Sequence, residues 1–260
     1  MFWEPTEPVL FFAALASFLI VLEIGFRVGL RQRPRSDEVG KAHVNALQAA
    51  LLGLLALLLG FNFAMAASRF DARKNLIEEE VNAIETTYLR AQLLPSPQRQ
   101  QADDLIRSYI DARLEFMRAG NDQAQLQKSY LDGSRIARQL WDMSSAMVAQ
   151  DQSGGPKSMF ISSLNDLINV NEKRRVALDN HVPELVIYLL FTVAVGAMGF
   201  IAYGYGLTGR RRHGTTAFYA VLIALVLTTI LDLDQPRSGL IRVSEDSMVH
   251  LKGSLDQNLP

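Results

Sequence analysis

The stretch NALQAALLGLLALLLGFNFAMAAS, residues Asn45–Ser68, contains no charged side chain and decides the fold. A membrane hydrocarbon core about 30 Å thick requires roughly 20 helical residues to cross it. Three further runs reach that length with few or no charges: Pro8–Leu30, Pro183–Leu207 and Gly214–Leu233. The sequence therefore predicts an all-α membrane protein with four transmembrane helices.

The composition excludes several function classes. The chain has 260 residues, a formal net charge of −1 and no cysteine. Near-zero charge argues against nucleic acid as a main partner, and the lack of cysteine excludes disulfides and cysteine-based metal sites. The sequence has no zinc-protease, nucleotide-binding or nucleophile-elbow motif. We therefore expect a protein that is not an enzyme and that has no cofactor or metal.

The apolar runs divide the chain into a transmembrane hairpin (1–68), a polar block (69–182), a second hairpin (183–233) and a tail (234–260). Glycine and proline are absent from Phe61 to Leu94, so we expect the second span to continue into the block as one helix of about 50 residues. Helical spacing of apolar residues predicts that the block is an extramembrane helical bundle. In the tail, Ser244–Leu255 is either an amphipathic helix at the membrane interface or a loose segment.

Basic residues near the span ends predict the orientation. The loop after the first span carries Arg31, Arg33 and Arg35, and the loop after the third carries Arg210–Arg212. With both loops cytoplasmic, the N-terminus, the block 69–182 and the C-terminus are expected in the periplasm of a bacterium, the protein being multi-pass in the inner membrane. Basic residues at the opposite span ends, among them Lys173–Arg175, favour the reverse orientation.

Two sets of residues on the second span suggest a pore. Small residues recur at helical spacing and allow close helix approach, whereas amides at membrane depth must meet protein or water. Helix packing accounts for the small residues, and an interhelical hydrogen bond accounts for Asn62 alone. The alternative is that one strip faces a water-filled pore, with Asn62 at a constriction. The residues expected to line it are Asn45, Gln48, Gly53, Ala56, Gly60 and Asn62.

Charged residues near the span ends are candidates for a pore entrance or gate. They are Arg69, Arg73, Glu78, Glu79, Glu80, Asp232 and Asp234. Carboxylates at a channel mouth concentrate cations, although a charge run is also typical of a solvated helix face. Within the first span, Glu23 precedes Arg27 by four residues, a spacing that favours a local ion pair. The alternative for Glu23 is a coupling or ion-binding site.

Several motifs resemble those of the bestrophin-like bacterial membrane proteins. They are His43-Val44-Asn45, Gly60-Phe61-Asn62-Phe63, Glu80-Val81-Asn82-Ala83, Tyr88-Leu89-Arg90 and, most specifically, Leu233-Asp234-Gln235-Pro236-Arg237-Ser238-Gly239-Leu240. The resemblance implies an oligomer around a central ion pathway lined by the second span, as in bestrophin chloride channels. Two departures set anion selectivity aside: Asp71 follows Arg69-Phe70 where animal bestrophins have proline, and the arginine loops place the block outside the cytosol. The carboxylates then lean toward a cation.

We therefore expect a homo-oligomeric ion channel whose partners are the lipid bilayer, copies of itself and inorganic ions. One subunit with four spans is too thin to enclose a hydrated pore, so several copies must surround it. The block 69–182 is expected to form a vestibule or gate. The alternative is a membrane sensor or scaffold whose helical bundle binds a ligand or a partner protein. That function requires a separate effector, because the predicted cytoplasmic loops are short.

Overall fold

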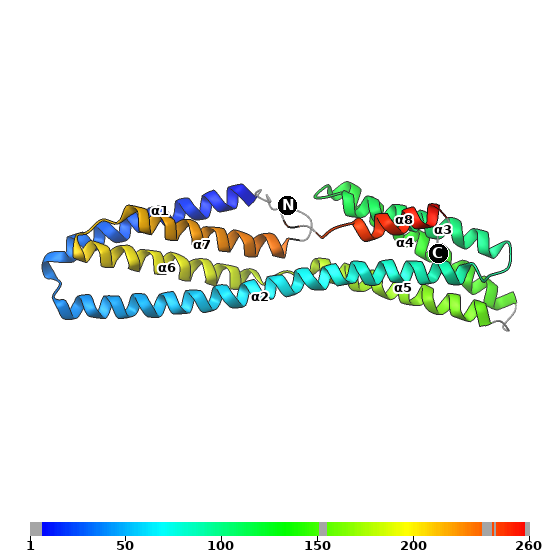
Figure 1. Cartoon of the computed structure of the whole chain (residues 1–260), viewed down its shortest axis with the longest axis horizontal. Coiled ribbons are helices and arrows are strands. Elements are labelled where there is room, and N and C mark those ends of the chain that lie inside the picture. Colours follow the sequence, from blue (N-terminus) through cyan, green and yellow to red (C-terminus); the bar gives the residue numbers. More distant parts are fainter. Residues whose placement is uncertain (1–6, 151–154, 236–240, 242, 258–260) are drawn as a thin grey trace. The chain divides into compact units, whose positions relative to one another are not determined.

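The computed structural model describes residues 7–150, 155–235, 241 and 243–257, and every regular element among them is helical (Figure 1). The elements are α1 (Glu7–Gln32), η1 (Arg33–Arg35), α2 (Glu38–Ala91), α3 (Gln98–Arg118), α4 (Gln123–Gln150), α5 (Gly155–Asp179), α6 (Glu184–Thr208), α7 (His213–Asp234) and α8 (Asp246–Asp256). Within these residues, 4 helices are long and apolar enough to cross a membrane. The predicted all-α fold with four candidate spans is confirmed.

The helices form two compact units. The first, called the membrane unit, contains α1, α2 up to Arg69, η1, α6, α7 and Ile241. The second, called the bundle unit, contains α2 from Phe70 onward, α3, α4, α5 and α8. Helix α2 runs for 54 residues without interruption, as its lack of internal helix breakers after Phe61 predicts.

In the membrane unit, α1 packs against both α6 and α7 (Figure 1). Its contact with α6 is very close because glycines occupy the interface. A Cβ atom added at Gly25 would lie 2.4 Å from the carbonyl oxygen of Gly199, and one added at Gly206 would lie 2.4 Å from that of Phe26. These backbone contacts leave no room for a larger side chain, so α1 and α6 form the central pair of this unit.

The core of the bundle unit is built from the apolar faces that the helical periodicity predicts. Its fully buried large side chains include Tyr109 and Ile110 of α3, Leu140 of α4, and Phe160 and Leu164 of α5. Burying such a side chain stabilises the fold by about 2 kcal/mol relative to leaving it exposed. This core holds the charged cluster described below in a fixed position.

Helix α8 forms where the sequence predicts a short amphipathic helix, but its apolar face is covered by protein. Met248, Leu251 and Leu255 are buried in the core of the bundle unit. Lys252 Nζ lies 2.6 Å from Asp111 Oδ1, which anchors the polar side of α8 to α3. Of the two alternatives, the helix is present, but its apolar face packs against the bundle unit, so the surface that a bilayer would cover is already occupied.

Candidate functional site

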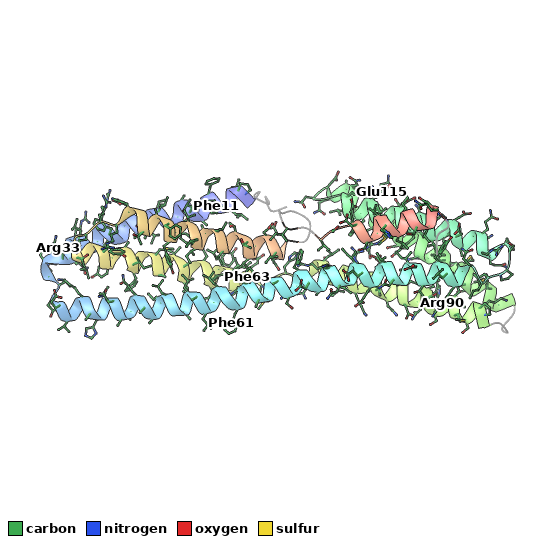
Figure 2. All side chains as sticks on the ribbon, viewed as in Figure 1. Phe11, Arg33, Phe61, Phe63, Arg90 and Glu115 are labelled. Carbon is green, nitrogen blue, oxygen red and sulfur yellow. The ribbon has the colours of Figure 1, made fainter. Side chains whose placement is uncertain are left out.

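The membrane part of α2 has one face turned into its own unit and another turned away from it. Leu55, Leu59 and Ala66 are buried on the inward face. On the outward face, a Cβ atom added at Gly53 or Gly60 would meet no atom within 4 Å. Large apolar side chains such as Phe61, which is labelled in Figure 2, flank these glycines and are exposed. Gly53 and Gly60 therefore leave space beside α2 that no described residue of the protomer fills.

Asn62 lies on the inward face. Its side chain is only 3% exposed, and its Nδ2 donates a hydrogen bond to the carbonyl oxygen of Leu58 at 2.8 Å. At 100° per residue, Asn62 is about 160° around the helix from Gly60. The expectation that the amides and the small residues share one strip was wrong. The two-residue spacing of Gly60 and Asn62 itself places them on opposite sides of a helix, which the alignment of the polar residues with one another does not change.

The other two amides that were expected to line the pore face a cavity in the membrane unit. Gln48 Nε2 donates to the carbonyl oxygen of Phe200 on α6 at 2.6 Å and lies against Gly204. Asn45 and Gln48 line a cavity of about 630 Å³ between α2, α6 and α7. Gln48 therefore makes the kind of interhelical hydrogen bond that was weighed for Asn62.

Glu23 of α1 interacts with two arginines. Its Oε1 lies 2.6 Å from Arg27 Nε, and its Oε2 accepts a hydrogen bond from Arg211 of the α6–α7 loop. The Arg211 guanidinium also lies over the ring of Phe26, 4.7 Å from its centroid. With both carboxylate oxygens bound to guanidinium groups, this arrangement supports a structural ion pair. Arg211 was missed as a partner because its only signal in the sequence is a basic loop.

Asp232 and Asp234, expected near a pore entrance, are only 4% and 6% exposed. The backbone N–H of Val182 donates to both carboxylate oxygens of Asp234 at 3.0 Å, and that of Ile241 donates to Asp232 Oδ2 at 3.1 Å. The two carboxylates thus satisfy backbone donors around the end of α7. The expectation of an exposed acidic entrance here was wrong, because both carboxylates are buried and bind backbone N–H groups beside the end of α7.

The glutamate run of α2 divides between surface and interior. Glu78 and Glu79 are exposed, whereas Glu80 is 0% exposed within the bundle unit. Arg113 Nε lies 2.8 Å from Glu80 Oε1, and Arg174 Nη1 contacts Oε2. Only Glu78 and Glu79 can act as the expected surface charge. The argument for a cation that rested on Glu80, Asp232 and Asp234 is lost.

Tyr109 completes the cluster around Glu80. Its hydroxyl donates to Glu80 Oε1 at 3.0 Å. Burial raises the pKa of Tyr109, and burial lowers the pKa of Arg113. Glu80, Tyr109, Arg113 and Arg174 are defined here as the Glu80 cluster, which joins α2, α3 and α5.

The two arginines expected at the gate have different surroundings. Arg73 is buried, and its guanidinium donates to the carbonyl oxygens of Ala177 at 3.2 Å and Asn180 at 3.0 Å. It therefore binds the negative, C-terminal end of α5. Arg69 Nη2 lies 3.9 Å from Met65 Sδ. Arg73 and Arg174 also line a cavity of about 440 Å³ in the bundle unit.

The raised pKa of Tyr109 predicts a pH effect. The unfolded chain ionises this phenol near pH 10 while the folded chain keeps it neutral, so its contribution to stability falls as the pH rises above about 10. We expect Tyr109→Phe to lose about 1 kcal/mol at pH 7 and to weaken the alkaline decline. Melting temperatures from pH 7 to pH 11 measure both effects. Tyr188→Phe, at an exposed tyrosine, is the control, and an unchanged decline in Tyr109→Phe would contradict the prediction.

Comparisons with known proteins agree with this architecture. The chain is similar to a bacterial bestrophin homologue from Klebsiella pneumoniae, with a TM-score of 0.63 at 15% identity over 93% of this chain and 95% of that one. A single-residue variant of the homologue gives a TM-score of 0.66 at 15% identity over 98% and 97%. No curated protein matches the chain. The similarity to these structures shows a shared fold.

The family match extends over nearly all of the helices. The family model of the bestrophin-like domain matches residues 10–248, from α1 to the first turn of α8. This range includes most of both units and every candidate pore or gate residue discussed above. The resemblance found in the sequence motifs is thus confirmed, and the chain belongs to the bestrophin-like domain family.

Proposed function

We propose that the protein is a homo-oligomeric ion channel and that the outward face of α2 lines its pore. The observation that supports this most directly is the row of small residues Gly53, Ala56 and Gly60, which are exposed in the protomer within a membrane-spanning helix. Membership of the bestrophin-like family supports ion conduction as the activity.

The glycines themselves argue for a role outside the protomer. A glycine in a helix costs about 1 kcal/mol relative to alanine, and at Gly53 and Gly60 no contact within the protomer compensates for that cost. Such residues are useful where another helix or a conduction pathway comes close. A conduction pathway requires several copies around a common axis, because one subunit with 4 candidate spans is too thin to enclose a hydrated pore.

The proposed orientation places both arginine loops in the cytoplasm of a bacterium and the bundle unit in the periplasm. Contacts in the membrane unit bring these loops together: Tyr203 donates to Gln32 Oε1 at 2.6 Å, and Arg33 packs against Gly209. The basic residues of both loops therefore lie at one end of the unit, as the positive-inside rule requires of a cytoplasmic end. The bundle unit would then be a vestibule or gate.

The chain has no cysteine, so a thiol reagent reacts only with a cysteine that is introduced. Single-cysteine variants therefore test which positions line the pore. Gly53→Cys, Ala56→Cys and Gly60→Cys should pass ions in liposomes, and a charged thiol reagent should reduce that flux at least severalfold. Leu225→Cys on the exposed face of α7 is the matched control, and its flux should not change. Asn62→Cys should react slowly because the side chain is buried.

Two outcomes would contradict the proposal. One is the absence of ionic flux in purified wild-type protein reconstituted in liposomes. The other is an equal reduction of flux by the thiol reagent in the variants Leu225→Cys and Gly60→Cys. Lack of flux together with co-purification of a stoichiometric cytoplasmic partner would support the sensor or scaffold alternative.

A further inference from the structure

The cavity in the membrane unit has an unusual lining. It measures about 630 Å³ and lies between the N-terminal half of α2, the C-terminal end of α6 and the start of α7. Its polar lining includes Asn45, Gln48, Arg210, Arg212 and Thr215. The set contains two arginines and no aspartate or glutamate. The polar part of the cavity is therefore suited to an anion.

The three arginines of the α6–α7 loop have two different environments. Arg211 is bound to Glu23 and covers Phe26. Arg210 and Arg212 line the cavity instead, and neither forms a salt bridge with a carboxylate among the residues that the structure describes. Two guanidinium groups without an acidic partner remain available to a ligand. Guanidinium binds phosphate through paired hydrogen bonds.

The start of α7 adds further donors to the same end of the cavity. Arg212 occupies the N-cap position and makes no side-chain capping hydrogen bond. The first backbone N–H groups of a helix have no intrahelical acceptor, and they carry a partial positive charge that favours phosphate. Thr215, in the first turn of α7, also lines the cavity and carries a hydroxyl group. The Thr216 hydroxyl donates to the carbonyl oxygen of Arg212 at 3.0 Å, so it can only accept a hydrogen bond from a ligand.

The rest of the wall is apolar and belongs to membrane-spanning helices. Leu52 of α2, Ile201 of α6 and Phe218 of α7 form this part. A free phosphate ion gains no favourable contact from an apolar wall. A phospholipid can contact both parts of the cavity, because its anionic headgroup is joined to apolar acyl chains. Basic pockets between transmembrane helices on the cytoplasmic side are typical headgroup sites.

We propose that this cavity binds an anionic phospholipid, with its phosphate at Arg210, Arg212 and the start of α7 and the first part of its acyl chains against Leu52, Ile201 and Phe218. The lipid would link the starts of α2 and α7 to the end of α6. The inference depends on membrane insertion and not on ion conduction, so it can fail or succeed independently of the proposed channel function.

Native mass spectrometry of the full-length protein tests the site, with phosphatidylglycerol and phosphatidylcholine as probes. The wild type should retain phosphatidylglycerol preferentially. The double variant Arg210→Gln/Arg212→Gln should weaken its apparent affinity by about 30-fold, from two lost contacts. The matched control is Arg31→Gln/Arg35→Gln, which removes the same charge from the other basic loop and should retain the wild-type affinity. Equal loss in both double variants would overturn a local site in favour of general surface attraction.

A photoactivatable phosphatidylglycerol with the reactive group in its acyl chain gives a readout independent of affinity. Labelling is expected on α2, α6 or α7 beside the cavity, and Leu52→Trp, which fills the apolar part, should reduce it severalfold while the melting temperature stays within a few degrees. Inorganic phosphate that competes as well as the lipid would overturn a lipid site. A neighbouring copy that fills the cavity would also overturn a lipid site. In that case the photoactivatable lipid would not label the protein, and the variant Phe218→Cys would form cross-links between copies.

Discussion

Replacing Glu80 by glutamine is expected to lower the free energy of unfolding by about 3 to 5 kcal/mol, the usual cost of removing one partner of a buried ion pair. Glu80 is completely buried and is the acidic member of the Glu80 cluster, in which it contacts Arg113 and Arg174. Glutamine keeps the size of the side chain but removes its charge. Two buried guanidinium groups would then lose their carboxylate, and desolvated charges without a partner are strongly unfavourable.

Thermal unfolding in detergent measures this effect, and a fall of the melting temperature by roughly 10 °C is expected for a chain of this size. The matched control is Glu79→Gln, the neighbouring glutamate, whose side chain is 53% exposed and lies 3.8 Å from Lys173. A surface ion pair contributes about 1 kcal/mol or less. Similar melting temperatures for the two variants would contradict the assignment of Glu80 as the centre of the cluster.

A double variant separates charge from packing. Glu80→Gln/Arg174→Met removes one negative and one positive charge, so one guanidinium fewer is left buried without a carboxylate. We expect it to be more stable than Glu80→Gln alone, because coupled residues give non-additive energies. A double variant that is less stable by the full sum of the single effects would show that Glu80 and Arg174 act independently.

The sequence predicts most of the fold because the signals that determine it are local. Uninterrupted apolar runs mark the spans, and the absence of helix breakers between Phe61 and Leu94 marks the long helix α2. The buried faces of Tyr109 and Leu164 follow from helical periodicity. Each of these properties depends on residues within a few turns of one another.

The environment of the charged and amide side chains is not local, and the sequence predicts it less well. Asp232 and Asp234 end a span where the sequence suggests an exposed channel mouth. In the structure, Asp234 binds the backbone N–H of Val182, 52 residues away, and Asp232 binds that of Ile241 beyond the end of the helix. Glu80 belongs to a run of glutamates that resembles a solvated face, yet α3 and α5 bring arginines to it. A charged residue on a helix can therefore be assigned to surface or interior only when the neighbouring helices are placed.

The sequence predicts the role of the outward face of α2 only in part. Small residues at helical spacing predict close approach of another helix, and the same pattern on α1 and α6 is used inside the protomer at Gly25 and Gly199. On α2, a Cβ atom added at Gly53 or Gly60 would meet no atom within 4 Å in the part of the chain that the structure describes. Composition alone does not distinguish a small residue that packs within the subunit from one that is left for other copies.

Placing valine at Gly29 is the test with the largest expected effect in the membrane unit. A Cβ atom there would lie 2.2 Å from the carbonyl oxygen of Tyr203, well inside the distance that any Cβ atom keeps. The obstacle is backbone and cannot rotate away, so α1 and α6 must separate along the contact. Overpacking usually lowers the free energy of unfolding by about 1 to 3 kcal/mol, and we expect a collision with backbone atoms to cost at least the upper value.

The expected result for Gly29→Val is a lower melting temperature and a larger distance between α1 and α6. Spin labels on a pair of introduced cysteines, one in each helix, measure this distance. Gly53→Val is the matched control, since its Cβ meets no atom of the protomer. In the proposed channel, where Gly53 faces the pore or another copy, this variant should keep the α1–α6 distance of the wild type while it changes ion flux or assembly. If Gly53→Val separated α1 from α6 as much as Gly29→Val did, the division of glycines into those that pack the protomer and those that face its neighbours would be wrong.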